Sequence, residues 1–189
     1  MISTAFAEEW KSVSEAALTK FELSSPMADG LSAASAAALK EIGLPEVVAA
    51  WLEFDETDDY LEPVVAVLEE KNMFPIGNIG FSALICIDKN TDKVVRFDTD
   101  YPDESEIINS SLKELYESML LFQSFVAEVK KRNPNYIEDY KIPDGMLGEL
   151  SEKLTACDPE AMREKGYWYC QVAALDDESS ESLKEFVFD

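Results

Sequence analysis

Three side chains with oxygen ligands alternate along one short stretch and could together bind a metal ion. Asp88, Asn90 and Asp92 match the first, third and fifth ligand positions of a calcium-binding EF-hand loop. That loop also needs a glycine at its sixth position and a glutamate at its twelfth, where this chain has Lys93 and Thr99. Apolar, β-branched segments flank the stretch, whereas an EF-hand has helices there. The stretch therefore predicts the turn of a β-hairpin, and no metal ligand is assigned.

The side chains that most often perform catalysis are absent or isolated. The chain contains no histidine, which excludes the Ser-His-Asp triad, the Cys-His pair and histidine-ligated metal sites. Cys86, Cys157 and Cys170 form no CxxC motif and are predicted to be reduced thiols in the core. The glycines of IGNIG match neither GxGxxG nor a P-loop. A pair of catalytic carboxylates stays open, but we predict no enzyme, no catalytic residue and no cofactor.

The net charge of the chain favours some classes of binding partner and argues against others. The sequence has 16 Lys and Arg against 39 Asp and Glu, a formal net charge of −23. Such a field repels nucleic-acid backbones and anionic membrane surfaces, so we predict no direct binding to nucleic acid or to membranes. The same field attracts a basic protein and speeds the encounter with it. The alternative is that the charge serves solubility alone.

Two acidic segments are the candidate partner-binding residues. They comprise Asp55, Glu56, Asp58 and Asp59 in the first segment, and Asp98, Asp100, Asp103, Glu104 and Glu106 in the second. Both segments are interpreted as loops, and the alternative is that they are only solvated. If the first segment contacts a partner, charge reversal at Asp58 and Asp59 is expected to act mainly on the association rate and its salt dependence.

Hydrophobic periodicity predicts most of the helices. The expected ranges are 4–20, 31–43, 45–54, 108–133 and 146–156. The helix over 108–133 has the clearest signals, because Ser111 and Glu114 form a capping box and Pro134 stops it.

Two later segments are less distinct. Asp158-Pro159 has the cap-then-proline pattern that opens a short helix. The apolar run 167–175 is compatible with either a strand or a helix.

Strands are predicted in the middle of the chain, where β-branched and aromatic residues cluster. VVAVLEE, at 64–70, is expected to be a strand, and 74–76 is expected to be an edge strand because it contains a proline. Gly77-Asn78 is interpreted as a turn. The segments 81–88 and 93–97 are expected to pair as a hairpin through KNTD.

Helices that flank a central block of strands without βαβ alternation predict an α+β fold. We expect one domain over 1–189, with an acidic tail at 176–189 that is only partly ordered. No apolar run is long enough to span a membrane, and the first residues lack the features of a signal peptide. The expected location is the cytoplasm.

Several motifs together resemble a known family. They are Leu44-Pro45, Ile76-Gly77-Asn78, the strands ICID and VVRF, Asn109-Ser110-Ser111-Leu112 at the start of the long helix, and Asp158-Pro159 followed by Trp168. Over about residues 40–175 the chain resembles the SUKH superfamily (SMI1/KNR4-like proteins), and in particular its SUKH-4 type of bacterial immunity protein.

The resemblance implies a twisted, mainly antiparallel sheet flanked by helices. It also implies a function, which is to bind a cognate protein toxin of nuclease or deaminase type and to neutralise it by occlusion. Toxins of this type are often basic, which agrees with the acidic charge of the chain. The alternative is a non-catalytic adaptor or chaperone that binds another protein. The identity of the partner and the oligomeric state stay open.

Overall fold

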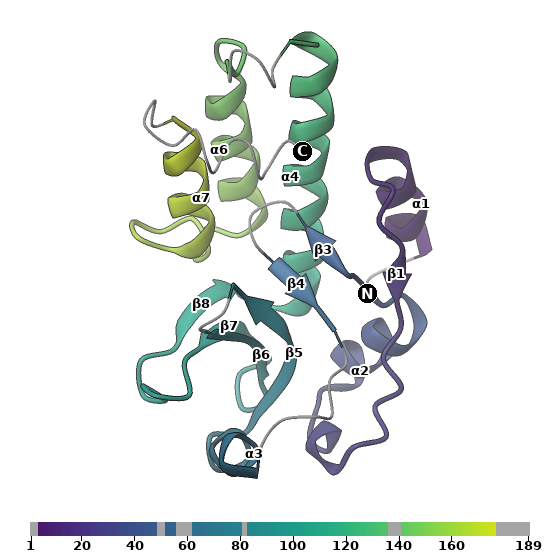
Figure 1. Cartoon of the computed structure of the whole chain (residues 1–189), viewed down its shortest axis with the longest axis vertical. Coiled ribbons are helices and arrows are strands. Elements are labelled where there is room, and N and C mark those ends of the chain that lie inside the picture. Colours follow the sequence, from purple (N-terminus) through teal and green to yellow (C-terminus); the bar gives the residue numbers. More distant parts are fainter. Residues whose placement is uncertain (1–3, 49–51, 56–61, 81–82, 136–140, 177–189) are drawn as a thin grey trace.

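The computed structural model of the chain describes residues 4–48, 52–55, 62–80, 83–135 and 141–176. In these ranges helices flank a central sheet, so the predicted α+β fold is confirmed (Figure 1). No helix in the described ranges has the length and apolar character needed to cross a membrane.

Six strands form a curled antiparallel sheet in the order β3-β4-β5-β6-β7-β8. These strands are β3 (Val47–Val48), β4 (Leu52–Phe54), β5 (Met73–Ile79), β6 (Ala83–Asp88), β7 (Val94–Phe97) and β8 (Glu106–Asn109). Each strand pairs with the next one along the chain, so no parallel crossover is needed. A separate antiparallel pair joins β1 (Leu18–Thr19) to β2 (Leu44–Pro45).

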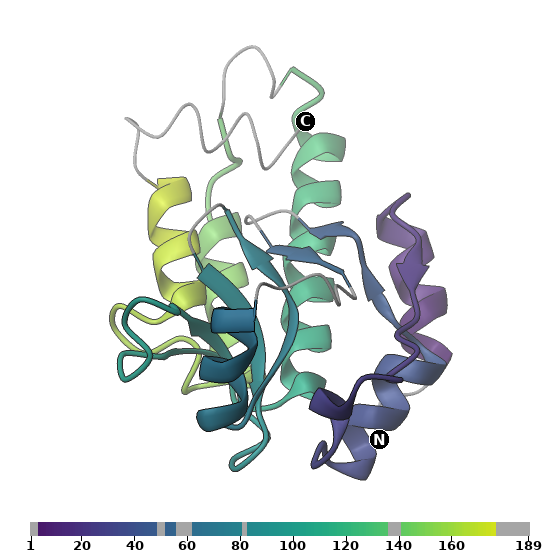
Figure 2. The ribbon, with the colours of Figure 1, turned by 60° about the horizontal axis from the view of Figure 1, so that its bottom comes forward.

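The helices surround the sheet on several sides (Figure 1). They are α1 (Thr4–Val13), the short 3-10 helix η1 (Pro26–Ala28), α2 (Ala33–Glu41), α3 (Glu62–Glu70), α4 (Leu112–Arg132), α6 (Met146–Cys157) and α7 (Tyr167–Asp176). The long helix α4 packs against α6 and α1. Figure 2 shows α1 and α2 on one side of α4 and α7 on the other. The predicted helices over 31–43, 108–133 and 146–156 are confirmed, and the first helix ends at Val13, earlier than expected.

The predicted hairpin is present and explains the alternating oxygen side chains. The Asp88 carboxylate accepts hydrogen bonds from the Asn90 backbone N–H at 2.9 Å and the Thr91 hydroxyl at 2.6 Å. Asp92 adopts a left-handed backbone conformation with φ 61°. Its carboxylate accepts hydrogen bonds from the hydroxyls of Ser32 at 3.0 Å and Ser35 at 2.8 Å. These oxygens therefore close the turn and fasten it to the start of α2. Within the described ranges, no group of three or more His, Cys, Asp or Glu residues is placed to hold a metal ion.

The helix predicted over 45–54 is wrong, because its described residues belong to β2, β3 and β4. Leu52 and Phe54 are buried on either side of the exposed Glu53. This alternation is the period of a strand with one buried face, and it pairs β4 with β5.

The strand predicted at 64–70 is also wrong, because these residues lie in α3. Val64, Val65 and Leu68 have helical spacing, with Leu68 fully buried and the two valines packed against the core. Pro63 lies in the first turn of the helix, where a proline needs no backbone N–H partner. Packing of this apolar face on β5 outweighs the preference of valine for strands.

The prediction of an edge strand at 74–76 is wrong, because β5 lies inside the sheet and pairs with both β4 and β6. The register shifts between Pro75 and Gly77, and such a bulge accommodates a proline inside a sheet. Gly77 and Asn78 belong to β5 and do not form a turn. A Cβ on Gly77 would lie 2.0 Å from the Glu53 carbonyl oxygen, so the close approach of β4 requires glycine there.

The two indistinct C-terminal segments are resolved in different ways. The run 167–175 is helical, as part of α7. Asp158-Pro159 does not open a helix, because the chain continues through turns to Gly166. A Cβ on Gly166 would lie 2.6 Å from the Ala161 carbonyl oxygen, which shows how tightly this segment folds back on itself.

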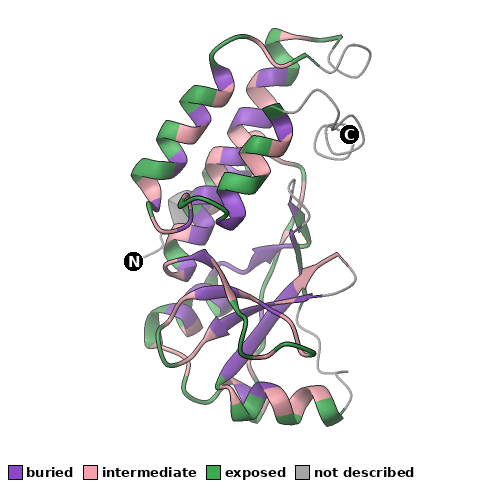
Figure 3. Cartoon of the chain, turned by 90° about the vertical axis from the view of Figure 1, so that its left-hand side faces the viewer, coloured by how far each residue is buried: buried purple, intermediate pink, exposed green. Residues whose placement is uncertain are grey.

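Both faces of the sheet contribute to the core. Cys86 and Ile87 are neighbours in β6 and point to opposite faces, and both are fully buried. Trp10 on α1 and Trp168 on α7 are also fully buried, at opposite sides of α4. Figure 3 shows that the sheet is mostly buried, whereas α3 at the bottom has an exposed face.

Candidate functional site

The acidic loop, residues 98–105 between β7 and β8, contains most of the second predicted segment. Asp98 shapes the loop, because its carboxylate accepts a hydrogen bond from the Asp100 N–H at 2.9 Å and its carbonyl accepts one from the Tyr101 N–H at 3.2 Å. The Tyr101 carbonyl accepts the Glu104 N–H at 3.0 Å. The loop is therefore folded by its own hydrogen bonds.

Two of the predicted carboxylates at this loop have a basic partner. Asp103 forms an ion pair with Lys71, just after α3, with 2.7 Å between the oxygen and Nζ, and this lysine holds the pKa of Asp103 below its usual value. Glu106 at the start of β8 lies 3.9 Å from the Arg96 guanidinium. Asp100 and Glu104 are exposed and form no ion pair within the described part of the chain. Two negative charges of the loop are thus free to meet a partner.

Tyr101 is a feature of the acidic loop that sequence reasoning missed. It is 63% exposed, the most exposed of the large hydrophobic residues in the described ranges. The sequence signal that could have found it is an aromatic residue followed by proline inside an acidic segment. Tyrosine is enriched among the residues that dominate binding energy in protein interfaces.

The first predicted segment is described only in part. Asp55 follows β4 and is exposed, although desolvation of its carboxyl raises the pKa. Glu56, Asp58 and Asp59 lie outside the described residues. The strand pairing shows that β4 and β7 run in opposite directions. The chain therefore leaves β4 toward Asp55 at one end of the sheet and leaves β7 toward Asp98 at the other end.

A second region, the polar network, joins Ser118 to motif residues that are distant in the sequence. Its members are Asn109, Ser110, Ser118, Asp158 and Trp168, from the end of β8, from α4, from the segment after α6 and from α7. The Trp168 indole N–H donates to the Asn109 side-chain oxygen at 2.9 Å. The Asn109 amide donates to Ser118 at 3.1 Å and to the Asp158 carboxylate at 3.0 Å. The network therefore joins the edge of the sheet to the helices.

Asp158 is the centre of the polar network. It is 2% exposed. Its carboxylate accepts both the N–H and the hydroxyl of Ser110 at 2.7 Å, as well as the N–H groups of Glu160 at 3.2 Å and Ala161 at 3.3 Å. Burial alone favours the neutral carboxyl, but the hydrogen bonds outweigh it and hold the pKa of Asp158 below its usual value. The charge of this aspartate is therefore used for structure and is unavailable to a partner.

The three cysteines are free thiols in different surroundings. Cys86 is buried, as predicted, and burial raises the pKa of its thiol. Cys157 is half-buried, and burial raises its pKa to about 11. Cys170 is exposed, so its predicted place in the core is wrong. Thiols with raised pKa values are poor nucleophiles at neutral pH.

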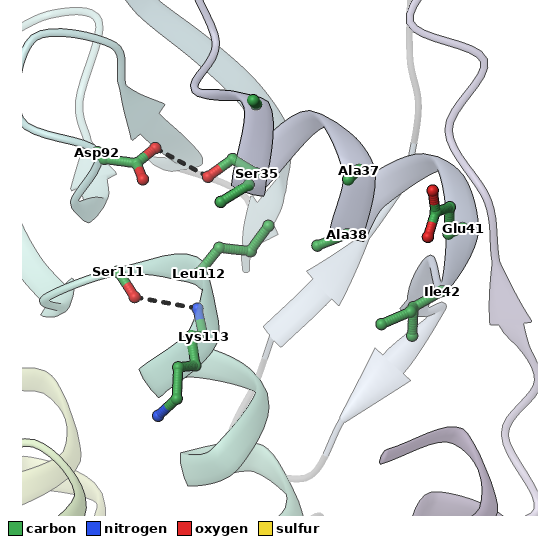
Figure 4. A pocket seen from close by; sticks show the side chains of 11 residues that line it. Ser35, Ala37, Ala38, Glu41, Ile42, Asp92, Ser111, Leu112 and Lys113 are labelled. Atoms are coloured by element: carbon green, nitrogen blue, oxygen red, sulfur yellow. Dashed lines mark hydrogen bonds between the residues drawn. The ribbon is translucent and has the colours of Figure 1, made fainter. Parts of the chain in front are cut away.

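A groove lies between α2 and the start of α4, and we call it the α2–α4 groove. Its volume is about 630 Å³. It is lined by Ala33, Ala34, Ser35, Ala37, Ala38, Glu41, Ile42, Asp92, Ser111, Leu112 and Lys113. Figure 4 shows α2 along one side, the first turn of α4 along the other, Asp92 toward the start of α2 and Glu41 toward its end. The acidic loop and this groove lie at opposite ends of β7, because Asp92 precedes β7 and Asp98 follows it. Sequence reasoning found α2 but not the space beside it.

Comparison with known proteins identifies the family. The model of the SUKH-4 immunity protein family matches residues 6–174. No curated protein and no solved structure matches the chain. Because the match covers most of the 189 residues, the chain belongs to the SUKH-4 immunity protein family.

Proposed function

Starting from membership in this immunity family, we propose that the chain binds a basic protein toxin inside the producing cell and neutralises it by occluding its active site. The family supports an immunity role. The net charge of −23 favours a basic partner. We place the toxin among nucleases and deaminases, whose substrates are nucleic acids and whose binding surfaces are positively charged.

The observation that carries this proposal is the chemistry of the acidic loop. Tyr101 is 63% exposed, and in the sequence it lies between Asp100 and Glu104, whose carboxylates form no ion pair in the described part of the chain. An aromatic ring and carboxylates together suit the active site of an enzyme that binds nucleotides, because such a site accepts a flat base and negative phosphates. Carboxylates in the phosphate subsites and a ring in the base subsite would block the substrate without any reaction.

The long-range field and the direct contacts act on different steps of binding. The free carboxylates of the acidic loop attract the basic toxin and raise the association rate, most strongly at low salt. A buried aromatic anchor lowers the dissociation rate. We include Asp55, Glu56, Asp58 and Asp59 as a second acidic contact whose contribution lies mainly in the association rate.

No chemistry by the chain itself is part of this proposal. The described carboxylates with shifted pKa values are explained by ion pairs, hydrogen bonds or desolvation. We therefore infer a non-catalytic protein that acts by binding. A chaperone or adaptor would also act by binding, but it would not protect a cell against a toxin.

Co-expression tests the proposal. A candidate nuclease or deaminase toxin domain from the producing cell is expressed in a sensitive host, with the chain or with a variant. We expect the native chain to restore growth and the triple variant Asp100→Lys, Tyr101→Ala, Glu104→Lys to fail. A control variant, Glu149→Lys with Glu152→Lys, changes the net charge equally at exposed positions of α6 and is expected to protect.

Binding kinetics with the purified toxin domain separate the contributions. Tyr101→Ala is expected to raise the dissociation rate on the order of tenfold, and Asp100→Lys to lower the association rate at low salt. If the triple variant protects as well as the native chain, the acidic loop is not the contact surface. If the native chain does not protect and the toxin domain does not bind it, the adaptor function becomes the better account.

A further inference from the structure

The α2–α4 groove exists because of the residues that α2 places beside α4. Ala33, Ala34 and Ala37 are exposed on α2, and their small side chains leave the space open toward Leu112 and Ile42. Ser35 and Ala38 also line the groove and are buried, and Leu39 is buried in the core. The groove thus has an apolar floor, and its volume of about 630 Å³ accommodates several apolar side chains.

The walls of the groove are fixed in place. Ser32 caps α2, and the Asp92 carboxylate accepts hydrogen bonds from Ser32 and Ser35 at 3.0 and 2.8 Å. Ser111 caps α4, where its hydroxyl oxygen accepts the Lys113 N–H at 3.1 Å. Capping at both helix starts keeps the groove preformed, so a ligand would not have to order its walls.

The charge exposed along the groove is negative. Asp92 and Glu41 lie toward opposite ends of α2 in Figure 4. The one ammonium group among the lining residues belongs to Lys113, and it points away from α2 toward its partners Glu114 at 3.3 Å and Glu117 at 2.8 Å. A ligand in the groove therefore meets an apolar floor and carboxylates near both ends of α2.

We propose that the α2–α4 groove binds one short amphipathic, basic helix of the toxin. Apolar side chains of that helix would rest on the alanine floor, and a Lys or Arg beside them would pair with Glu41. The small floor residues allow the close approach that helix packing requires. This inference rests on the proposed function and adds the groove to the two acidic contacts. The groove and the acidic loop lie at opposite ends of β7.

The charge also argues against a second copy of this chain as the occupant. Two chains that each carry a net charge of −23 repel one another. A groove of this shape, open along exposed positions of α2, suits the face of a helix better than a small molecule that needs enclosure. Charge and shape together favour a basic helix.

A model peptide tests the chemistry of the groove without the toxin. The probe is a synthetic helix with leucine on one face and lysine on the other, and its control has serine in place of leucine. We expect the leucine peptide to shift the amide NMR signals of residues 33–42, 92 and 111–113, and the serine peptide to shift them much less. Shifts confined to the acidic loop, or no binding, would overturn the proposal.

Matched variants test whether the toxin uses the same groove. Ala37→Trp fills the groove, and Ala173→Trp makes the same change at an exposed alanine of α7. We expect Ala37→Trp to weaken the affinity for both the leucine peptide and the toxin domain by about tenfold, and Ala173→Trp to change neither. Glu41→Gln, with Glu152→Gln as control, is a milder second variant that leaves the helix intact.

The two proposals fail in different ways. If the chain protects against the toxin but Ala37→Trp and Glu41→Gln bind it with native affinity, the groove proposal is wrong and the proposed function stands. If the chain does not protect, the proposed function is wrong, even where the leucine peptide maps to the groove. A toxin whose binding is weakened only by the groove variants would support the groove against the acidic loop.

Discussion

The polar network and the acidic loop both depend on aspartate, yet they use its charge in opposite ways. Asp158 is 2% exposed and accepts hydrogen bonds from Asn109, Ser110 and the backbone that follows it. Asp100 is exposed and has no ion-pair partner within the described residues. In the network the carboxylate holds elements of the fold together, whereas in the loop it is free to meet another protein.

This contrast separates stability from binding. A change in the polar network should lower the free energy of unfolding and leave the binding surface unchanged in the molecules that stay folded. A change in the acidic loop should alter binding and leave the free energy of unfolding unchanged.

The largest effect is expected for Asp158→Ala. The substitution leaves the buried amide of Asn109 and the N–H of Ser110 without their acceptor, and each buried unsatisfied donor costs about 1–3 kcal/mol. We expect the free energy of unfolding to fall by about 3 kcal/mol or more, measured by urea denaturation. Asp100→Ala is the control and is expected to stay within about 0.5 kcal/mol of the native chain. Equal effects of the two substitutions would remove the distinction between the regions.

Trp168→Phe tests one hydrogen bond of the network. Phenylalanine keeps most of the buried ring but cannot donate to the Asn109 oxygen, which the indole N–H reaches at 2.9 Å. We expect a loss of about 1–2 kcal/mol in the free energy of unfolding, from thermal and urea unfolding. Tyr101→Phe removes a polar group from an exposed ring and should leave the unfolding midpoint unchanged. A native midpoint for Trp168→Phe would show that the network contributes little.

A smaller effect is expected in the pH dependence of the free energy of unfolding, which should fall at low pH because of Asp158. The folded pKa of Asp158 lies below its ordinary value of 3.8, so the unfolded chain binds the proton more readily. The stabilisation from Asp158 is therefore full above the unfolded pKa and is lost as pH falls through the folded pKa. We expect the native chain to lose more stability than Asp158→Asn when the pH is lowered below 3.8. Parallel pH profiles for the two proteins would contradict this role.

The smallest effect on stability is expected for Lys71→Ala. Its ion pair with Asp103 is exposed, and such pairs contribute little to folding. We expect an unchanged unfolding midpoint, while the loop carries one more free carboxylate and associates faster with a basic toxin at low salt. Lys153→Ala, at an exposed position on α6, is the control for the lost positive charge. A lower midpoint for Lys71→Ala would show that the acidic loop also supports the fold.

The two regions also differ in how far the sequence reveals them. The acidic loop is visible as composition, because Asp98 to Glu106 is a short run of like charges with turn residues. The polar network is invisible to spacing, because Asn109 lies 49 residues from Asp158 and 59 from Trp168. The family resemblance singled out all three residues, and the cap-then-proline pattern also marked Asp158, but only the fold shows that they meet.

The errors in secondary structure have a common physical origin. VVAVLEE is β-branched but forms α3, which packs on β5. The range 45–54 was predicted as a helix but contributes strands, of which β4 pairs with β5. Proline inside a sheet is usually found on an edge strand, so Pro75 predicted an edge strand. A bulge at Pro75 instead accommodates it in a strand inside the sheet. Local preference fails where a tertiary neighbour provides a better partner. The α2–α4 groove has the same origin, since an alanine-rich helix does not reveal which of its faces is covered.

Hydrogen–deuterium exchange of the chain, alone and with a candidate toxin domain that it binds, shows directly whether the acidic loop is the contact surface. We expect the toxin to slow exchange in the acidic loop, residues 98–105, and to leave exchange of the amides of Asn109 and Trp168 unchanged. Protection elsewhere, with exchange in the acidic loop unaltered, would contradict the claim that this loop is the surface that neutralises the toxin.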